Sequence, residues 1–168
     1  RPGGGGPRRV GGSGFGGGRW PCEGPLWYKD EGHLLFSDIE NNKRMKWSPS
    51  SGISLDFEPS NQANGLTRDL QGRLIACEHK TRRIVRYEPE GPVTVIANNY
   101  KGTRLNRPND TIVKSDGTIY FTDPGAPDPE LDLDFSGVYR VSEDLGTLTL
   151  FLKNFVTPNG IALSPDES

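Results

Sequence analysis

The sequence predicts an all-β fold, a β-propeller of four-stranded blades, with about three blades complete and a fourth begun. Three observations support this prediction. A unit that reads as two strand hairpins recurs along the chain, its period is roughly 40–50 residues, and one class of residue opens each unit. A β-sandwich is the main alternative for evenly spaced strands, but it does not explain why the same residue class recurs at the same place.

Each unit opens with a residue that carries a side-chain oxygen. These four opening residues, called anchors below, are Glu23, Asn64, Asn109 and Asn159. Successive anchors lie 41, 45 and 50 residues apart, and the last interval is longest because a Pro- and Asp-rich loop, Gly125–Phe135, is inserted. An apolar strand, an Asp- or Gly-containing turn and a second strand follow each of the first three anchors, which is the pattern of a half-buried hairpin.

Each complete unit then adds a second hairpin that turns at a glycine. The expected strands are Met45–Trp47 with Ile53–Phe57, Val85–Tyr87 with Val93–Ala97, and Tyr139–Val141 with Leu148–Leu152. Three blades do not close a ring, so we expect either a fragment or a missing half that comes from elsewhere. We also expect exposed sheet edges and an exposed apolar face.

Composition separates the start of the chain from the rest. Residues 1–21 are rich in Gly and Arg, which predicts a disordered tail, and residues 22–168 form the partial propeller domain. The tail holds four of the 20 basic residues and no acidic one, so the remainder carries 16 basic against 22 acidic residues. This balance argues against nucleic acid as a partner. No apolar run approaches the roughly 20 residues of a membrane span, and no signal peptide is visible, so we expect no membrane partner and a cytoplasmic location.

The anchors are candidates for a metal site. Rotation about the propeller axis relates equivalent positions of successive blades, so all four anchors should point into one end of the central channel if the first strand of each blade is innermost. Carboxylate and amide oxygens are hard donors that suit Ca²⁺, Mg²⁺ or Mn²⁺. Zn²⁺ is less favoured, because the two His and two Cys residues show no ligand spacing.

The pair Asn-Gly is also a signal for a hairpin turn, and this alternative applies to Asn64 and Asn159. Such a turn should lie between two apolar strands. Residues 58–62, before Asn64, are mostly polar, and a proline precedes both Asn109 and Asn159. We therefore expect the asparagines to open strands rather than to close hairpins.

Seven short motifs follow one another in order at blade spacing. They are Glu23–Pro25, Ala63–Leu66, Cys77–His79 with Arg82–Arg83, Arg104–Asp110, Phe121–Pro124, Gly137–Arg140 and Pro158–Gly160. Through these motifs, residues 22–168 resemble the N-terminal half of the SMP-30/gluconolactonase/luciferin-regenerating family of six-bladed calcium propellers. The gluconolactonase-like branch is the most similar.

The resemblance implies both a ligand set and a substrate site. Glu23, Asn109 and Asn159 are implied to bind Ca²⁺, or another divalent cation such as Mg²⁺, Mn²⁺ or Zn²⁺. A fourth ligand, an Asp, is expected beyond the end of the chain. Arg107, Asn109 and Asn64 are implied to bind the substrate, a small-molecule sugar lactone.

The implied reaction is hydrolysis of the lactone to an aldonic acid, with the cation polarising the lactone carbonyl. In the family the general base is usually assigned to this same Asp, which is expected beyond Ser168. No catalytic residue is therefore assigned, and we expect little or no lactonase activity from these 168 residues. The segment Gly125–Pro127 replaces an aromatic-containing loop of the family. The alternatives are a non-catalytic propeller that binds a small ligand and a paraoxonase-like lactonase or esterase.

Two further polar residues, His79 and Asp123, come at or just after the end of a second strand. We expect both to lie away from the propeller axis. Their expected role is to make hydrogen bonds in turns and at blade edges.

Overall fold

The computed structural model describes residues 22–125, 128–153 and 155–167. The expected Gly/Arg-rich tail, residues 1–21, lies outside this part of the chain. The described residues form three four-stranded antiparallel sheets and one two-stranded ribbon, which confirms the all-β prediction. None of them forms a helix long and apolar enough to cross a membrane.

In each sheet the order of strands in space is the order along the chain. The first blade contains β1 (Glu23–Tyr28), β2 (His33–Asp38), β3 (Lys43–Ser48) and β4 (Gly52–Phe57). The second contains β5 (Ala63–Arg68), β6 (Leu74–Glu78), β7 (Arg83–Arg86) and β8 (Thr94–Ala97). The third contains β11 (Thr111–Val113), β12 (Ile119–Asp123), β13 (Gly137–Val141) and β14 (Leu148–Leu152). The six strands expected for the second hairpins all coincide or overlap with these strands.

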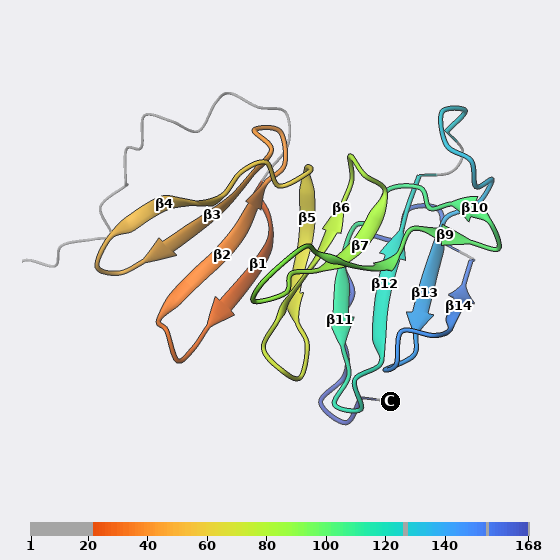
Figure 1. The fold of residues 1–168 in the computed structure, drawn as a ribbon. Coiled ribbons are helices and arrows are strands. Elements are labelled where there is room, and N and C mark those ends of the chain that lie inside the picture. The colour runs from red at the N-terminus through yellow and green to blue at the C-terminus, as the bar shows by residue number, and fades with distance from the viewer. Residues whose placement is uncertain (1–21, 126–127, 154, 168) are drawn as a thin grey trace, which may run out of the picture.

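The three sheets stand side by side as blades, with the second blade between the other two (Figure 1). The first strand of each blade contacts the first strand of its neighbour, β1 against β5 and β5 against β11. The first strand is therefore innermost, as the propeller prediction required. This arrangement brings the start of each blade towards one axis.

The second blade is buried on both faces because it lies between the other two blades. Successive side chains of its strands point to opposite faces, so each face contributes to a different cluster. In β6, Ile75 and Cys77 pack into the cluster shared with the third blade, which also contains Phe121 and Tyr139. Ala76, between them, packs into the other cluster, shared with the first blade. Two apolar interfaces of alternating residues therefore hold the three blades together.

The first and third blades each have only one neighbour among the described residues, and their outer strands are exposed. Leu55 of β4 is 53% exposed and Phe151 of β14 is 55% exposed. Trp47 and Ile53 of the first blade are also among the exposed apolar side chains. These findings confirm the expected exposure of apolar residues at the two open ends of the array.

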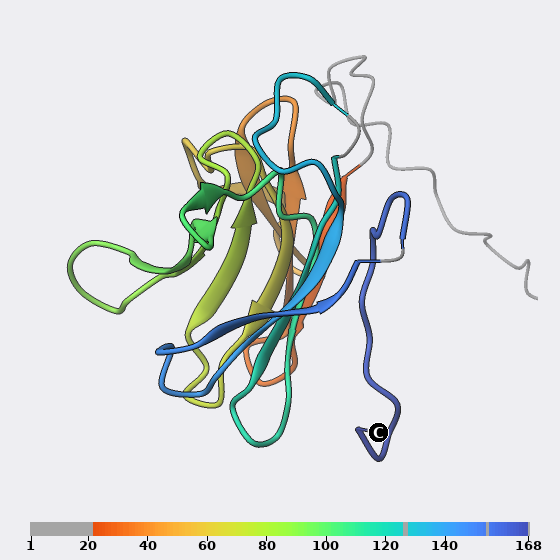
Figure 2. The same cartoon turned by 90° about the vertical axis from the view of Figure 1, so that its right-hand side faces the viewer.

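Two features differ from the sequence-based description. The chain between the second and third blades forms a small ribbon, β9 (Asn99–Tyr100) with β10 (Thr103–Arg104), which was not predicted. The start of the fourth unit, residues 159–163, is not assigned as a strand, because a strand requires a paired neighbour and none lies beside it in the described part of the chain. This segment instead runs extended at the side of the array (Figure 2), where the backbone N–H of Ile161 donates to Asp110 Oδ2 at 3.0 Å.

One contact between blades repeats at every interface. The backbone carbonyl oxygen of an anchor accepts a hydrogen bond from the preceding blade. Its donors are Ser37 Oγ to Asn64 at 2.7 Å, Gly65 N to Asn109 at 2.8 Å, and Thr122 Oγ1 to Asn159 at 2.6 Å. Each of the three blades thus donates a hydrogen bond to the backbone carbonyl of the anchor that opens the next unit.

Gly24 makes the closest approach at the first of these interfaces. Its φ is +57°, and a Cβ placed on it would lie 2.2 Å from the carbonyl oxygen of Asn64. Gly52, at the start of β4, has a similar φ of +67° but open space where its Cβ would be. A side chain at either glycine would strain a left-handed backbone, but only a side chain at Gly24 would also clash with the next blade. Comparing the two positions therefore isolates the free-energy cost of the clash.

We predict that Gly24→Ala destabilises the protein by about 2–3 kcal/mol more than Gly52→Ala does, because both variants strain the backbone but only the first overpacks an interface. Urea unfolding followed by circular dichroism measures both changes. Equal losses of unfolding free energy in the two variants would contradict the close approach.

Candidate functional site

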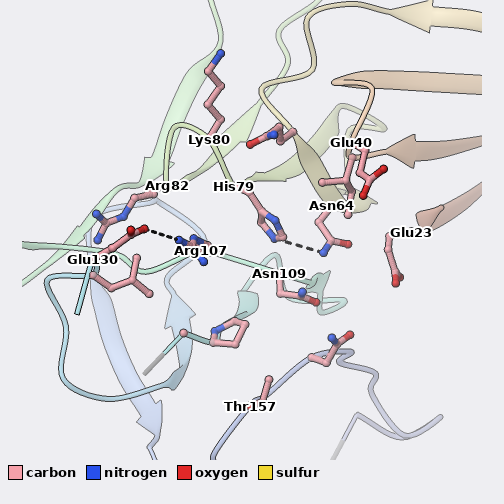
Figure 3. A pocket seen from close by; sticks show the side chains of 16 residues that line it. Glu23, Glu40, Asn64, His79, Lys80, Arg82, Arg107, Asn109, Glu130 and Thr157 are labelled. Carbon is pink, nitrogen blue, oxygen red and sulfur yellow. Dashed lines mark hydrogen bonds and ion pairs between the residues drawn. The ribbon is translucent and has the colours of Figure 1, made fainter. Parts of the chain in front are cut away.

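A cavity of about 990 Å³ opens at the axis end of the blades, where the anchors lie. All four anchors, Glu23, Asn64, Asn109 and Asn159, line it (Figure 3). The other lining residues come mainly from the loops that follow the second strand of each blade. The structure therefore brings together side chains from four repeats that are far apart in the sequence.

The position of each anchor follows from its place at the start of a unit. Glu23 is the first residue of β1 and Asn64 is the second of β5, whereas Asn109 comes two residues before β11. Asn64 and Asn109 are only 6% and 8% exposed, while Asn159 is exposed. The expectation that Asn64 opens a strand rather than closing a hairpin is confirmed.

The four anchors offer side-chain oxygens to the cavity. The anchors supply one carboxylate, from Glu23, and three side-chain amides. No group of three or more His, Cys, Asp or Glu residues that could hold a metal occurs among the described residues. Carboxylate and amide oxygens such as those of the anchors are ligands that hard cations such as Ca²⁺ accept, whereas zinc favours nitrogen and sulfur ligands.

His79 also lines the cavity, and the expectation that it lies away from the axis was wrong. It follows β6 directly, as Ile39 follows β2 and Pro124 follows β12, and all three residues reach the cavity. Alignment of the repeats at the end of the second strand, rather than at its start, would have found this set. Each of the three blades therefore contributes a second equivalent position to the cavity wall.

The imidazole of His79 lies against Asn64, with Nε2 of the ring 3.3 Å from Nδ2 of the amide. Burial and, to a smaller extent, the positive charge of Arg107 lower the pKa of His79 to about 4. The ring is therefore neutral near pH 7, and one of its nitrogens is a hydrogen-bond acceptor.

Arg107 reaches the cavity from the segment that leads into β11, and its side chain is 47% exposed. Its guanidinium lies 3.5 Å from Asp128 Oδ2 and 3.8 Å from Glu130 Oε2. Both acids belong to the loop after β12, and Glu130 lines the cavity too. The inserted Pro- and Asp-rich loop thus forms part of the cavity wall and balances the charge of Arg107.

Asp123, the last residue of β12, is completely buried and is not among the residues that line the cavity. Its Oδ2 accepts a hydrogen bond from the backbone N–H of Asn106 at 2.8 Å, which confirms its expected hydrogen-bonding role. Its Oδ1 is buried without a partner in the described structure, as is the hydroxyl of Tyr139. Burial raises the pKa of Asp123 to about 7, although the hydrogen bonds from the backbone oppose this shift.

Comparison with known proteins gives a consistent set of relatives. A family model described as the SMP-30/Gluconolactonase/LRE-like region matches residues 21–168. A gluconolactonase from Zymomonas mobilis subsp. mobilis is 37% identical over 166 residues, which cover 87% of this chain and 46% of the relative. The solved structure of a gluconolactonase from Xanthomonas campestris has a TM-score of 0.78 and 35% identity, and the match covers 87% of this chain and 52% of that chain.

A calcium-binding protein, regucalcin from Agrobacterium tumefaciens, shares the fold with a TM-score of 0.66 at 19% identity, over 87% of this chain and 48% of that chain. The chain spans about half the length of each of these relatives.

We predict that Asp123 makes the protein less stable as the pH rises from about 4 to about 7. The pKa of Asp123 is raised in the folded state, so between these values the folded state binds more protons than the unfolded state. Its stabilisation is complete below the unfolded pKa, is lost as the pH rises through the folded pKa, and amounts to roughly 4 kcal/mol at most.

Asp123→Asn removes this titration and keeps an acceptor for Asn106 N–H. Urea unfolding at several pH values between 4 and 8 should show that the difference in unfolding free energy, variant minus wild type, grows with pH. A constant difference would mean that the carboxyl group titrates normally in the folded state.

Proposed function

This chain belongs to the SMP-30/gluconolactonase/LRE-like family, and from that membership we propose that its protein hydrolyses sugar lactones with a bound divalent cation. Identities of 37% and 35% to two gluconolactonases support the reaction class. The observation that carries the proposal is the convergence of Glu23, Asn109 and Asn159 on one cavity that also contains Arg107 and Asn64.

In this proposal Glu23, Asn109 and Asn159 hold the cation through a carboxylate and two amide oxygens. Ca²⁺ is the first candidate, because these donors are hard and neutral amides suit a cation that accepts many oxygen ligands. When bound, the cation polarises the lactone carbonyl and stabilises the negative charge that develops on its oxygen.

The remaining cavity residues bind and orient the sugar. The amides of Asn64 and Asn109 each offer a donor and an acceptor, which is what a sugar hydroxyl requires. Their low exposure, 6% and 8%, leaves little of either residue in contact with solvent, and a lower local dielectric strengthens the hydrogen bonds that they make. Arg107 offers further donors from the part of the cavity wall beside the loop after β12.

The charge of that wall favours a neutral substrate. Asp128 and Glu130 lie within 3.5 Å and 3.8 Å of the Arg107 guanidinium, so its positive charge is already balanced before a ligand binds. A sugar lactone is neutral and rich in hydroxyl groups, and it needs donors and acceptors rather than an opposite charge. The ion pairs therefore support a lactone more than a phosphorylated sugar.

We predict that hydrolysis of glucono-δ-lactone by the purified full-length protein is abolished by a chelator and restored by Ca²⁺. Glu23→Gln removes the one carboxylate of the ligand set and should weaken Ca²⁺ binding by about 100-fold or more, at least the loss seen when outer partners of metal ligands are removed. Calorimetric titration with Ca²⁺ and a pH-stat assay measure the two effects.

The matched control is Glu40→Gln, because Glu40 lines the same cavity but lies outside the proposed ligand set. It should keep Ca²⁺ affinity within a few-fold of the wild type. Equal effects of the two substitutions would contradict the ligand assignment. Saturable lactone binding without turnover would instead favour a propeller that only binds its ligand.

A further inference from the structure

We propose that His79 is a positioning residue that holds the side-chain amide of Asn64 with its oxygen turned into the cavity. This inference rests on the proposed function, in which the cavity holds a cation and a lactone. His79 does not touch either of them in this proposal. It acts through Asn64.

The chemistry of the two side chains decides which atom donates and which accepts in the hydrogen bond between them. The nitrogen of an Asn amide can only donate, so the nitrogen of His79 that lies 3.3 Å from Asn64 Nδ2 must accept. This requires the neutral imidazole that carries its proton on Nδ1. Figure 3 shows the consequence, because the oxygen of Asn64 points away from His79 and lies on the side of Glu23.

All other parts of the pair are fixed by the fold. The backbone carbonyl of Asn64 accepts the hydroxyl proton of Ser37 at 2.7 Å, and its side chain is nearly buried. The turn that carries His79 is bound to the segment before β5, because the N–H of His79 donates to the carbonyl of Gln62 at 3.2 Å. The fold leaves one torsion of Asn64 undetermined, the rotation of its amide group about the Cβ–Cγ bond. This torsion has broad, nearly two-fold preferences.

The contact with His79 decides between the two orientations. If the amide turned over, its oxygen would face the lone pair of the accepting ring nitrogen, and the hydrogen bond would be replaced by repulsion. An imidazolium would reverse this preference, since it donates from both nitrogens. The lowered pKa of His79, about 4, keeps the imidazolium from forming at neutral pH.

The orientation matters because the two ends of an amide have opposite partial charges. With the oxygen inward, Asn64 adds its oxygen to those of the other three anchors, Glu23, Asn109 and Asn159, which line the same cavity. With the nitrogen inward, it would direct two partially positive hydrogens at the same place. In a cavity that holds a cation, the second arrangement weakens cation binding and replaces an acceptor for a sugar hydroxyl by a donor.

The first test compares two substitutions at His79. Gln can place its carbonyl oxygen near the site of the accepting ring nitrogen, whereas Leu removes the acceptor and keeps an apolar side chain. We expect His79→Leu to weaken Ca²⁺ affinity about tenfold or more and to raise the lactone KM more than it lowers kcat. His79→Gln should stay within about threefold of the wild type in both quantities.

A second background separates positioning from a general structural role. In Asn64→Asp both side-chain atoms are oxygens, so the orientation of the group no longer matters. His79→Leu should then reduce Ca²⁺ affinity in the wild-type background but much less in the Asn64→Asp background. Equal losses in the two backgrounds would overturn the proposal, because His79 would then act by some route other than the amide.

A third measurement needs neither a variant nor a cation. Nitrogen NMR of the wild-type protein distinguishes protonated from unprotonated ring nitrogens, and Nε2 of His79 should be unprotonated at pH 7. A proton on Nε2 would overturn the proposal. If the protein neither bound Ca²⁺ nor hydrolysed lactones, the proposed function would fail, while this measurement would still decide the orientation of Asn64.

Discussion

The structure depends on one hydrogen bond that recurs between blades, from a donor of one blade to the backbone carbonyl of the next anchor. Asn64, Asn109 and Asn159 are all held in this way. The same backbone atom is fixed each time. The side chains of successive anchors are therefore related by the same rotation about the axis that relates successive blades. Through this hydrogen bond, residues that repeat along the sequence place their side-chain oxygens around one cavity.

The donor of this bond changes while its acceptor does not. A hydroxyl donates in the first and third blades, from Ser37 and Thr122. The equivalent residue of the second blade is Cys77, a buried thiol, and there the backbone N–H of Gly65 donates instead. A Cβ on Gly65 would lie 2.7 Å from the carbonyl oxygen of Asn109, so the absence of a side chain allows the backbones to meet. The blades use different chemistry to keep one geometry.

Within each anchor, backbone and side chain have separate tasks. The carbonyl joins the blades, and the side chain is left for the cavity. The surrounding charges support this division, because His79 is neutral and Arg107 is balanced by Asp128 and Glu130. The carboxylate of Glu23 is then the one charge among the anchors.

The sequence by itself determined the blade period, most of the strands and the meeting of the anchors at one cavity, because repetition at a constant spacing leaves little choice once the first strand is innermost. Only the tertiary structure decided which nitrogen of His79 faces Asn64, which acids balance Arg107, and how far burial shifts the pKa of Asp123. These properties depend on distances between loops of different length and on the exclusion of water. Loop lengths and the exclusion of water differ from blade to blade, so the repeat in the sequence does not predict them.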